Sequence, residues 1–549
     1  MYNPRPKRII GWRSAPGGGI RMKTFLRVVY IASLFASVFT ASPFASAQQS
    51  CESLASLKIT NVTITTATAI SAPPDWNVPS TPGRFGTPPG LKVSVPFCRV
   101  AGFATPTSDS HIGFEVWLPV AANWNGNYIG IGNPGFIGAI SYGGLVREIA
   151  KGSVAASTDT GHNDVGATSE APDAWAIGHP EKITDWGHRA VHETTVAAKA
   201  LLLAYYGRPA KLSFWSSCHE GGNQALTEAQ KYPLDFDGIA AGDPAYYITH
   251  LQSASEWFGW ISLNDGGVKG AAYIPPAKYA VIHRAVLDQC DTIDGVRDGV
   301  LENPLQCHFH PETIHCPTKT DNASCLTGPQ VETAKHIYQG PRTADGKLIY
   351  PGFDPGSELG WSIMAAGPDP ISISTGFFRA VVYGDLNWDY HTFDVERDSR
   401  KAAEEYGAAL DSNNPNLKAF KDHGGKLLLY NSWDEAAVPP RASVEYYDSV
   451  NATMGGVEKT KDFFRLFMVP GMGMCPGFGF GNDGTFDAMD VVQKWRVTGV
   501  APDRIVNSHK TAGAVDKTHP ACAWPQQAIY KGSGDPMDAA NFTCGLAKK

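Results

Sequence analysis

The stretch that decides the fold lies near the middle of the chain and reads Phe214-Trp215-Ser216-Ser217-Cys218-His219-Glu220-Gly221-Gly222. Lys211–Trp215 is typical of a strand, Ser216–Gly222 of a sharp turn, and Asn223–Lys231 of a helix. A strand, a tight turn and a helix in this order are the setting of a nucleophile elbow, the turn that presents a catalytic side chain above a sheet. The sequence therefore predicts an elbow at residues 216–222.

Strand-like and helix-like stretches alternate on both sides of this turn. The predicted strands are Ile112–Leu118, Asn127–Ile131, the buried Ser153–Ser157, and later Lys426–Tyr430 and Phe464–Val469, and the clearest helix is the Ala/Leu-rich Val191–Tyr206. Alternation of this kind predicts an α/β fold with a mostly parallel sheet covered by helices.

Residues 245–420 interrupt that rhythm. They hold Gly/Pro-rich loops, four cysteines and many aromatic residues, among them Trp257, Trp260 and Trp361. We interpret 245–420 as an inserted lid domain. The catalytic domain is then expected to consist of residues 48–244 and 421–549.

The N-terminus carries an export signal. Arg21, Lys23 and Arg27 precede the apolar run Val28–Phe39, and the small-residue site Ala45-Ser46-Ala47 follows. These are the three parts of a secretory signal peptide, so we expect residues 1–47 to be removed and the protein to be secreted or periplasmic. Residues 1–21 precede Met22 and are predicted to be an upstream extension. The apolar run is short for a membrane span, and no later segment is more apolar over that length.

Ten cysteines follow the predicted cleavage site, which suits an oxidising compartment. Sequence spacing suggests three local disulfides, Cys290–Cys307, Cys316–Cys325 and Cys522–Cys544, and leaves Cys51, Cys98, Cys218 and Cys475 for two more. The C-x-x-C spacing that is typical of zinc sites does not occur in the sequence. The formal net charge is −7 and no basic stripe alternates with aromatic residues, so a nucleic-acid partner is not expected.

The turn and the residues after it resemble the tannase/feruloyl esterase family, which includes feruloyl esterases, tannases and the hydrolase of the PET monoester MHET. The resemblance rests on Phe214–Gln224, on Phe236–Ala245, on Ala156–His162, on Tyr430–Glu435 and on Val469–Cys475, and it extends over nearly the whole mature chain. It implies an α/β-hydrolase fold with a large inserted lid domain. It also implies an aromatic or phenolic small molecule as the substrate.

The family's catalytic residues do not stand at the matching positions. The family elbow has Cys-Ser-x-Gly-Gly, which places His219 at the serine; Tyr430–Glu435 places Glu435 at the aspartate, with Asp434 next to it as the other candidate. The family's Pro-Gly-Met-x-His-Cys signature places Met474 at the histidine. The resemblance also implies a Cys218–Cys475 disulfide between the nucleophile and base loops, and Cys51–Cys98 as the remaining pair. The frame is therefore kept and the catalytic residues inside it are changed.

Methionine accepts no proton near neutral pH, so ordinary Ser–His–Asp acyl transfer is not expected. One hypothesis is acid–base chemistry by a direct His219–Glu435 pair, with an oxyanion pocket formed by the Glu220 N–H and the Gly132-Asn133 loop. Isomerisation, elimination, hydration or a retro-aldol step would suit such a site. A second is unusual hydrolysis of aryl esters, with His219 as a nucleophile; a third is a binding protein without catalysis. His162 is expected near the pocket, in a structural or a functional role.

An acidic loop, Cys290–Val300, contains three aspartates and two glycines. Oxygen ligands on a turning loop are what Ca²⁺ prefers, although the spacing is not that of an EF-hand. The resemblance implies a structural calcium site made by the side chains of Asp291, Asp294 and Asp298 and the carbonyls of Val296 and Val300. The alternative is a solvated acidic turn.

Overall fold

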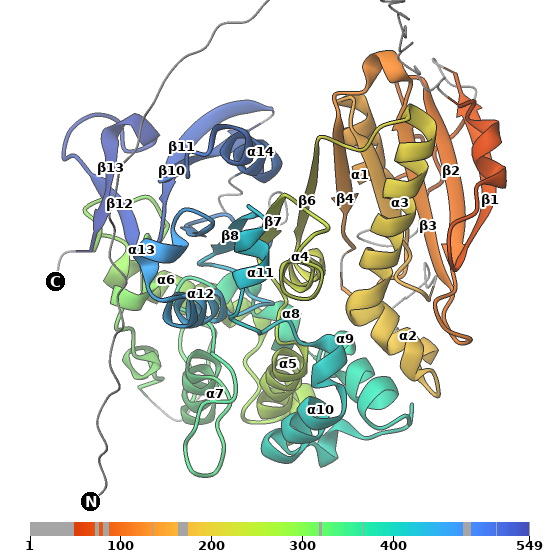
Figure 1. Cartoon of the computed structure of the whole chain (residues 1–549). Helices are drawn as coiled ribbons and strands as arrows, with labels where there is room; N and C mark the ends of the chain where they lie inside the picture. Colours follow the sequence, from red (N-terminus) through yellow and green to blue (C-terminus); the bar gives the residue numbers. More distant parts are fainter. Residues whose placement is uncertain are drawn as a thin grey trace, which may run out of the picture. The chain divides into compact units, whose positions relative to one another are not determined.

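A nine-stranded mixed sheet forms the centre of the computed structural model (Figure 1). The structure describes residues 49–547 except 72–75, 81–86, 134, 163–173, 318–320, 366, 476–484 and 512. The predicted signal peptide, residues 1–47, and the predicted upstream extension, residues 1–21, lie outside the described residues. Residues 47–549 cluster as one compact unit.

The sheet has the strand order β1-β2-β3-β5-β4-β6-β7-β8-β9. Strands β1 to β3 are antiparallel to their neighbours, whereas β4 to β9 run parallel to one another. The strands are β1 (Val62–Ile70), β2 (Phe97–Ala104), β3 (Ile112–Pro119), β4 (Asn127–Ile131), β5 (Val154–Thr158), β6 (Leu212–Cys218), β7 (Gly238–Gly242), β8 (Lys426–Ser432) and β9 (Phe464–Val469). This order, with β4 and β5 exchanged and an elbow after β6, is that of the α/β-hydrolase fold, as predicted.

Helices cover both faces of the parallel strands because alternate side chains along a strand point to opposite faces. Tyr128 of β4 belongs to the same apolar cluster as residues of α3 (Ala190–Tyr206), α4 (Glu220–Lys231) and α12 (Arg441–Met454). The next residue, Ile129, belongs to a second cluster with α1 (Tyr142–Ala150) and α14 (Ala488–Thr498). The sheet thus lies between two helical layers, and it carries the loops at the carboxyl ends of its parallel strands, where α/β proteins bind ligands.

The long connection between β7 and β8, where the sequence indicates Gly/Pro-rich loops, also carries seven α-helices among the described residues. They are α5 (Ile248–Leu263), α6 (Tyr279–Cys290), α7 (Gly328–Gln339), α8 (Ser362–Ala365), α9 (Ser372–Gly376), α10 (Val395–Leu410) and α11 (Lys418–Asp422). Figure 1 shows α5, α7 and α10 gathered together in green to teal. The predicted lid limits, 245 and 420, fall inside this connection.

Two hairpins that the sequence did not predict follow α14. They are β10 (Arg504–Thr511) with β11 (Ala514–Cys522), and β12 (Gln526–Tyr530) with β13 (Phe542–Leu546). The Cys522–Cys544 disulfide joins one hairpin to the other. Through β11 this C-terminal part reaches the acidic loop of the lid.

Five disulfides pair all ten cysteines, and all five predicted pairs are confirmed. They are Cys51–Cys98, Cys218–Cys475, Cys290–Cys307, Cys316–Cys325 and Cys522–Cys544. Among the described residues, no helix combines the length and the apolar character needed to cross a membrane.

Candidate active site

The elbow is tighter than the sequence predicted. Strand β6 continues to Cys218, which pairs with Gly242 of β7, and α4 starts at Glu220, so the turn itself is His219 alone. His219 has φ 62° and ψ −116°, a region that non-glycine residues rarely occupy and that clusters at functional sites. Its N–H donates to the Gly242 carbonyl at 2.9 Å, and its carbonyl accepts from Ala245 N at 3.0 Å. The neighbouring strand thus holds His219 in the strained conformation.

The imidazole of His219 lines a cavity of about 440 Å³. Its Nε2 is buried and has no hydrogen-bond partner among the described residues. Burial lowers the pKa of His219 to about 4, because the charged imidazolium is disfavoured away from water. The ring is therefore neutral near pH 7, and one of its two nitrogens can accept a proton.

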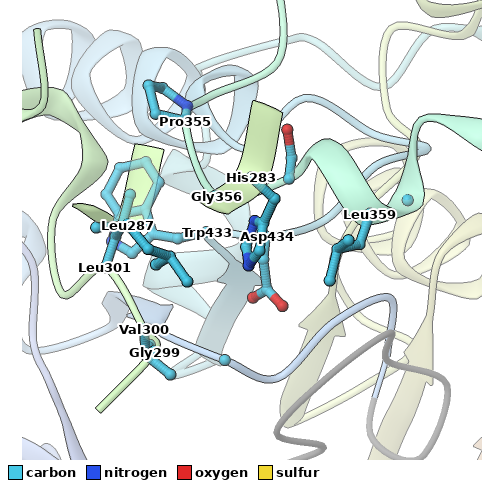
Figure 2. A pocket seen from close by; sticks show the side chains of 13 residues that line it. His283, Leu287, Gly299, Val300, Leu301, Pro355, Gly356, Leu359, Trp433 and Asp434 are labelled. Atoms are coloured by element: carbon cyan, nitrogen blue, oxygen red, sulfur yellow. The ribbon is translucent and has the colours of Figure 1, made fainter. Parts of the chain in front are cut away.

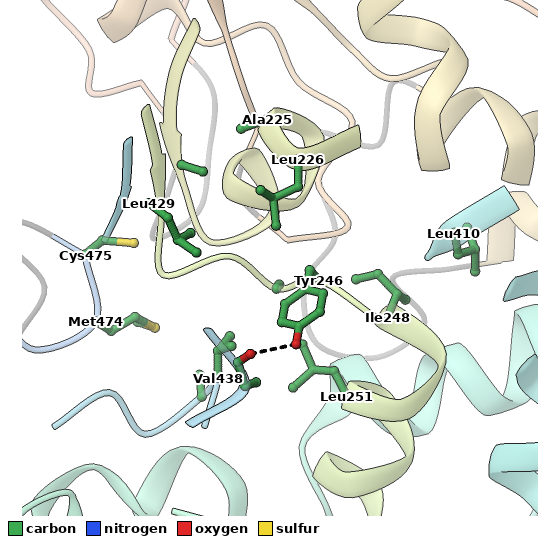
Figure 3. Packing of buried hydrophobic residues seen from close by; sticks show 14 of the residues in the cluster. Ala225, Leu226, Tyr246, Ile248, Leu251, Leu410, Leu429, Val438, Met474 and Cys475 are labelled. Atoms are coloured by element: carbon green, nitrogen blue, oxygen red, sulfur yellow. Dashed lines mark hydrogen bonds between the residues drawn. The ribbon is translucent and has the colours of Figure 1, made fainter. Parts of the chain in front are cut away.

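Met474 lines the same cavity. It directly precedes Cys475, whose disulfide with Cys218 joins the Met474 loop to the elbow. Its side chain is 7% exposed, and the Cys218–Cys475 bond fixes the backbone next to it. Figure 3 shows Met474 and Cys475 in an apolar cluster with Val438 and Leu251. Met474 therefore supplies an apolar wall.

Glu435 is fully buried on the loop after β8 and does not contact His219 as a direct partner. Its Oε1 accepts from the N–H groups of Ala437 at 2.5 Å and Val438 at 3.2 Å, while its Oε2 has no partner. The expected direct His219–Glu435 pair is therefore wrong for this structure: the added methylene lets the carboxyl group fold back onto its own loop. Burial, followed by the nearby Asp243, raises the pKa of Glu435 well above its usual range, which favours its uncharged form.

Asp434, the other candidate acid, points away from the main cavity. It lines a second cavity of about 110 Å³ together with His283 of α6 (Figure 2). Its Oδ1 accepts from Ser432 Oγ and from Gly473 N, which ties the acid loop to the Met474 loop. His283 is held by Glu358, 2.8 Å from its Nδ1. Asp434 is thus a loop-joining residue.

Asp243 lies next to the elbow and has a role that the sequence does not predict. It is fully buried, and it accepts from Ser432 N at 2.8 Å and from Cys475 N at 3.0 Å. It follows β7 and so connects three loops below the elbow. Its backbone φ of 36° is a structural sign that sequence patterns do not carry.

The predicted oxyanion pocket is present only in part. Glu220 N–H stands in the first turn of α4, where helical N–H groups lack intrahelical partners. Gly132 packs so closely on the elbow that a Cβ there would lie 2.8 Å from the Gly221 Cα. Asn133 N–H, however, donates to Gln224 Oε1 at 3.1 Å, and its Nδ2 donates to the Ala139 and Thr158 carbonyls. Asn133 is therefore wrong as an oxyanion donor here, because its donors are already used.

His162 does not line the cavity. Its Nε2 lies 2.8 Å from the Phe136 carbonyl, and its ring stacks on Trp175. Phe136 does line the cavity, so His162 positions a wall residue. This is the structural role of the two that the sequence left open.

The acidic loop of the lid holds its aspartates by backbone hydrogen bonds. Asp291 accepts from Asp298 N and Gly299 N, Asp294 from Val296 N, and Asp298 from Val300 N. Lys517 of β11 also donates to Asp298 Oδ2 at 2.9 Å. In the described chain, the only three ligand-type side chains with donor atoms within 4.8 Å of one another are Cys218, Asp243 and Cys475, whose sulfurs form a disulfide.

The fold and the strained elbow define an α/β-hydrolase-type protein, and comparisons with known proteins identify the family. Residues 98–545 match the family described as tannase and feruloyl esterase. An uncharacterised esterase of Xanthomonas campestris pv. campestris is 35% identical over 550 residues, covering 91% of this chain and 92% of the relative. A probable feruloyl esterase B-2 of Aspergillus oryzae is 32% identical over 504 residues, covering 89% and 93%.

The crystal structure of an esterase from Aspergillus oryzae superposes with a TM-score of 0.82 at 31% identity, covering 90% of this chain and 99% of that one. The chain belongs to the tannase and feruloyl esterase family.

Proposed function

We propose that this protein hydrolyses a neutral ester of an aromatic or phenolic acid, with His219 as the general base. The observation that carries the proposal is the neutral imidazole of His219 at the elbow apex, facing a largely apolar cavity. The names of the relatives, which include feruloyl esterases, support an ester as the substrate. His219 at the family's serine position and Met474 at its histidine position are compatible with this chemistry, because a general base can activate water directly.

In the proposed hydrolysis, His219 serves first as the base and then as the acid. His219 takes a proton from water as the water oxygen attacks the ester carbonyl carbon, and the carbonyl π electrons move onto its oxygen. The N–H of Glu220, at the positive end of α4, stabilises that oxyanion. The ester C–O bond then breaks, and the leaving alkoxide takes the proton from the imidazolium, giving acid and alcohol.

Glu435 acts in this proposal as a positioning residue. Its uncharged carboxyl group holds the backbone at Ala437, a residue that lines the cavity. Met474 makes its part of the cavity wall apolar and excludes water there, which strengthens electrostatic interactions with the developing oxyanion.

A second reaction class uses the same parts. A neutral base beside a helix N-terminus also suits proton abstraction next to a carbonyl, as in isomerisation, elimination, hydration or a retro-aldol step. The absence of a hydrogen bond from Glu435 to His219 favours neither class. A protein that only binds its ligand is the remaining alternative.

The test compares the wild-type protein with His219→Ala on alkyl esters of hydroxycinnamic and hydroxybenzoic acids in ¹⁸O-labelled water. We expect the label in the acid product, and a loss of about 10²–10⁴-fold in turnover for His219→Ala. Met474→Leu, which changes the cavity but removes no base, is the matched control and should stay within a few-fold of wild type. Unlabelled, rearranged product would favour proton abstraction; ligand-induced thermal stabilisation without product would favour binding alone.

We also propose export and a structural calcium ion. The signal-peptide pattern in residues 1–47 and the five disulfides support export to an oxidising compartment. In the acidic loop, burial and then the nearby Asp298 and Glu302 raise the pKa of Asp294 to about 6. The donor set fits Ca²⁺ in charge and kind, with Asp291, Asp294, Asp298 and the carbonyls of Val296 and Val300 as ligands.

A further inference from the structure

One wall of the main cavity is a single face of helix α5. Leu251, Gln252 and Ser255 line the cavity from this helix. Residues three and four positions apart lie on the same side of a helix, so the amide of Gln252 and the hydroxyl of Ser255 are neighbours on that wall. The other walls come from α8, the start of α9, the Met474 loop, the elbow and the loop after β4. Apolar residues line α8 and the Met474 loop, whereas Ser141, Ser217 and Ser372 add hydroxyl groups elsewhere.

Gln252 carries an unused polar group. The residue is 6% exposed, and its Oε1 is buried without a hydrogen-bond partner among the described residues. Leaving a buried amide oxygen unpaired is unfavourable, so native proteins seldom do it without a reason. An apolar side chain of the same size would fill this wall at lower cost if the amide had no ligand to meet.

The wall is held in place from behind. Glu256, one turn after Gln252, is fully buried, and its Oε2 accepts from Ser374 Oγ at 2.7 Å and from Thr375 Oγ1 at 2.9 Å. These bonds tie α5 to α9, whose first residues line the cavity. The amide of Gln252 therefore sits on a fixed support, as a recognition group requires.

The described residues that line the cavity offer no charged group to pair with a charged ligand. Of the described residues that line it, only His219 and Glu220 have side chains that titrate, and burial favours the uncharged form of both. A ligand carboxylate or ammonium group would lie here without a counter-charge, which is costly. The ligand's polar groups should therefore be neutral ones.

We propose that Gln252 binds a hydroxyl group on the ring of the aromatic ligand and so determines the specificity of the cavity. A hydroxyl both donates and accepts, so it pairs with the amide through Oε1 or, after a half-turn of the amide, through Nε2. A methoxy group can only accept, and an unsubstituted ring can do neither. The aromatic character of the ligand rests on the proposed function; the role of the amide rests on the geometry of α5.

The test measures binding rather than turnover. In the His219→Ala background, calorimetry compares methyl esters of cinnamic acid with and without a ring hydroxyl. We expect the hydroxylated ester to bind roughly tenfold to a hundredfold more tightly. Adding Gln252→Leu should reduce that preference to about twofold or less, and it should change the affinity of the unsubstituted ester far less. Leu251→Met, an apolar change on the same wall, is the matched control and should keep the preference.

Each other result decides against the proposal. A hydroxyl preference that survives in Gln252→Leu overturns it, as does the lack of any preference or of any binding at millimolar ester. If Gln252→Leu unfolds early, Gln252→Met tests the same loss of the amide. The proposed function fails separately: a preference that depends on Gln252 without turnover by the wild-type protein sinks the hydrolysis and keeps this inference.

Discussion

Glu435 is bonded to its own loop and not to His219, although the two residues occupy the positions where the family resemblance places the acid and the nucleophile. Its Oε1 meets the N–H groups of Ala437 and Val438, and the His219 Nε2 has no partner. The site therefore contains a base without an orienting acid. Five testable predictions follow from the geometry of this site and of the acidic loop.

Replacing Glu435 by Gln should have little effect on catalysis. Gln keeps an oxygen for Ala437 N and Val438 N, and the native carboxyl group is already uncharged. We expect kcat/KM on an aromatic ester within about threefold of wild type, compared with about 10⁴-fold when the acid of a working triad is neutralised. Steady-state kinetics measure this. A loss above a hundredfold would show that Glu435 works as a charged partner of His219.

The pH profile should report the buried imidazole. An ordinary histidine titrates near pKa 6.5, whereas burial lowers the pKa of His219 to about 4. The acid limb of kcat/KM is therefore expected near pH 4. An acid limb near 6.5 would contradict a buried neutral base.

The same shift has a consequence for stability. Between about pH 6.5 and pH 4 the unfolded chain binds a proton at His219 and the folded chain does not. The contribution of His219 to the free energy of unfolding is therefore lost as the pH falls through that window. Denaturant unfolding at pH 5 and pH 7 should show a larger loss for wild type than for His219→Ala. Comparing the two proteins removes the contributions of the other buried histidines. Equal losses in both would mean that His219 is not the shifted group.

Rebuilding the family's triad should produce an ordinary serine esterase. The Cys218–Cys475 disulfide and the buried Asp243 keep the elbow, acid and base loops together, so the frame for such a triad is already present. The triple variant His219→Ser, Met474→His, Glu435→Asp should hydrolyse aryl esters, and a serine-directed sulfonyl fluoride should abolish that activity. His219→Ser alone, which lacks a base, is the control. If the triple variant is no faster than this control, the three positions do not form a triad.

The parts of this structure that the sequence predicted have local signals. The elbow has a strand pattern before it and glycines after it, and the strands Ile112–Leu118 and Phe464–Val469 are largely apolar stretches with one charged residue each. The observed strands there are Ile112–Pro119 and Phe464–Val469. The five cysteine pairs followed from spacing together with the resemblance. In each case the determining residues are close in sequence or lie within a known frame.

The parts that could not be predicted depend on which polar group meets which. Nothing in the sequence indicates that Asn133 N–H is used by Gln224, or that Glu435 folds back onto Ala437. Both outcomes are set by the packing of loops that are far apart in sequence. The C-terminal hairpins were missed for a related reason: β11 is exposed at its start and buried at its end, and it mixes charged and apolar residues, so it has no clear alternation.

Calcium removal should destabilise residues 245–420, which contain the acidic loop, without a direct effect on His219. Asp294 is a half-buried carboxylate near Asp298 and Glu302, and a divalent cation would offset this like-charge repulsion. We expect millimolar Ca²⁺ to raise the Tm of chelator-treated protein, and Asp294→Asn to weaken that response, because a ligand of the folded state stabilises it by mass action. Asp288→Asn, an exposed aspartate just before the loop, is the control and should respond like wild type. Lys517 already donates to Asp298, so the lysine is the alternative counter-charge of this loop. In that case Ca²⁺ would not change the Tm, and Lys517→Met would lower it. That result would contradict a metal site here.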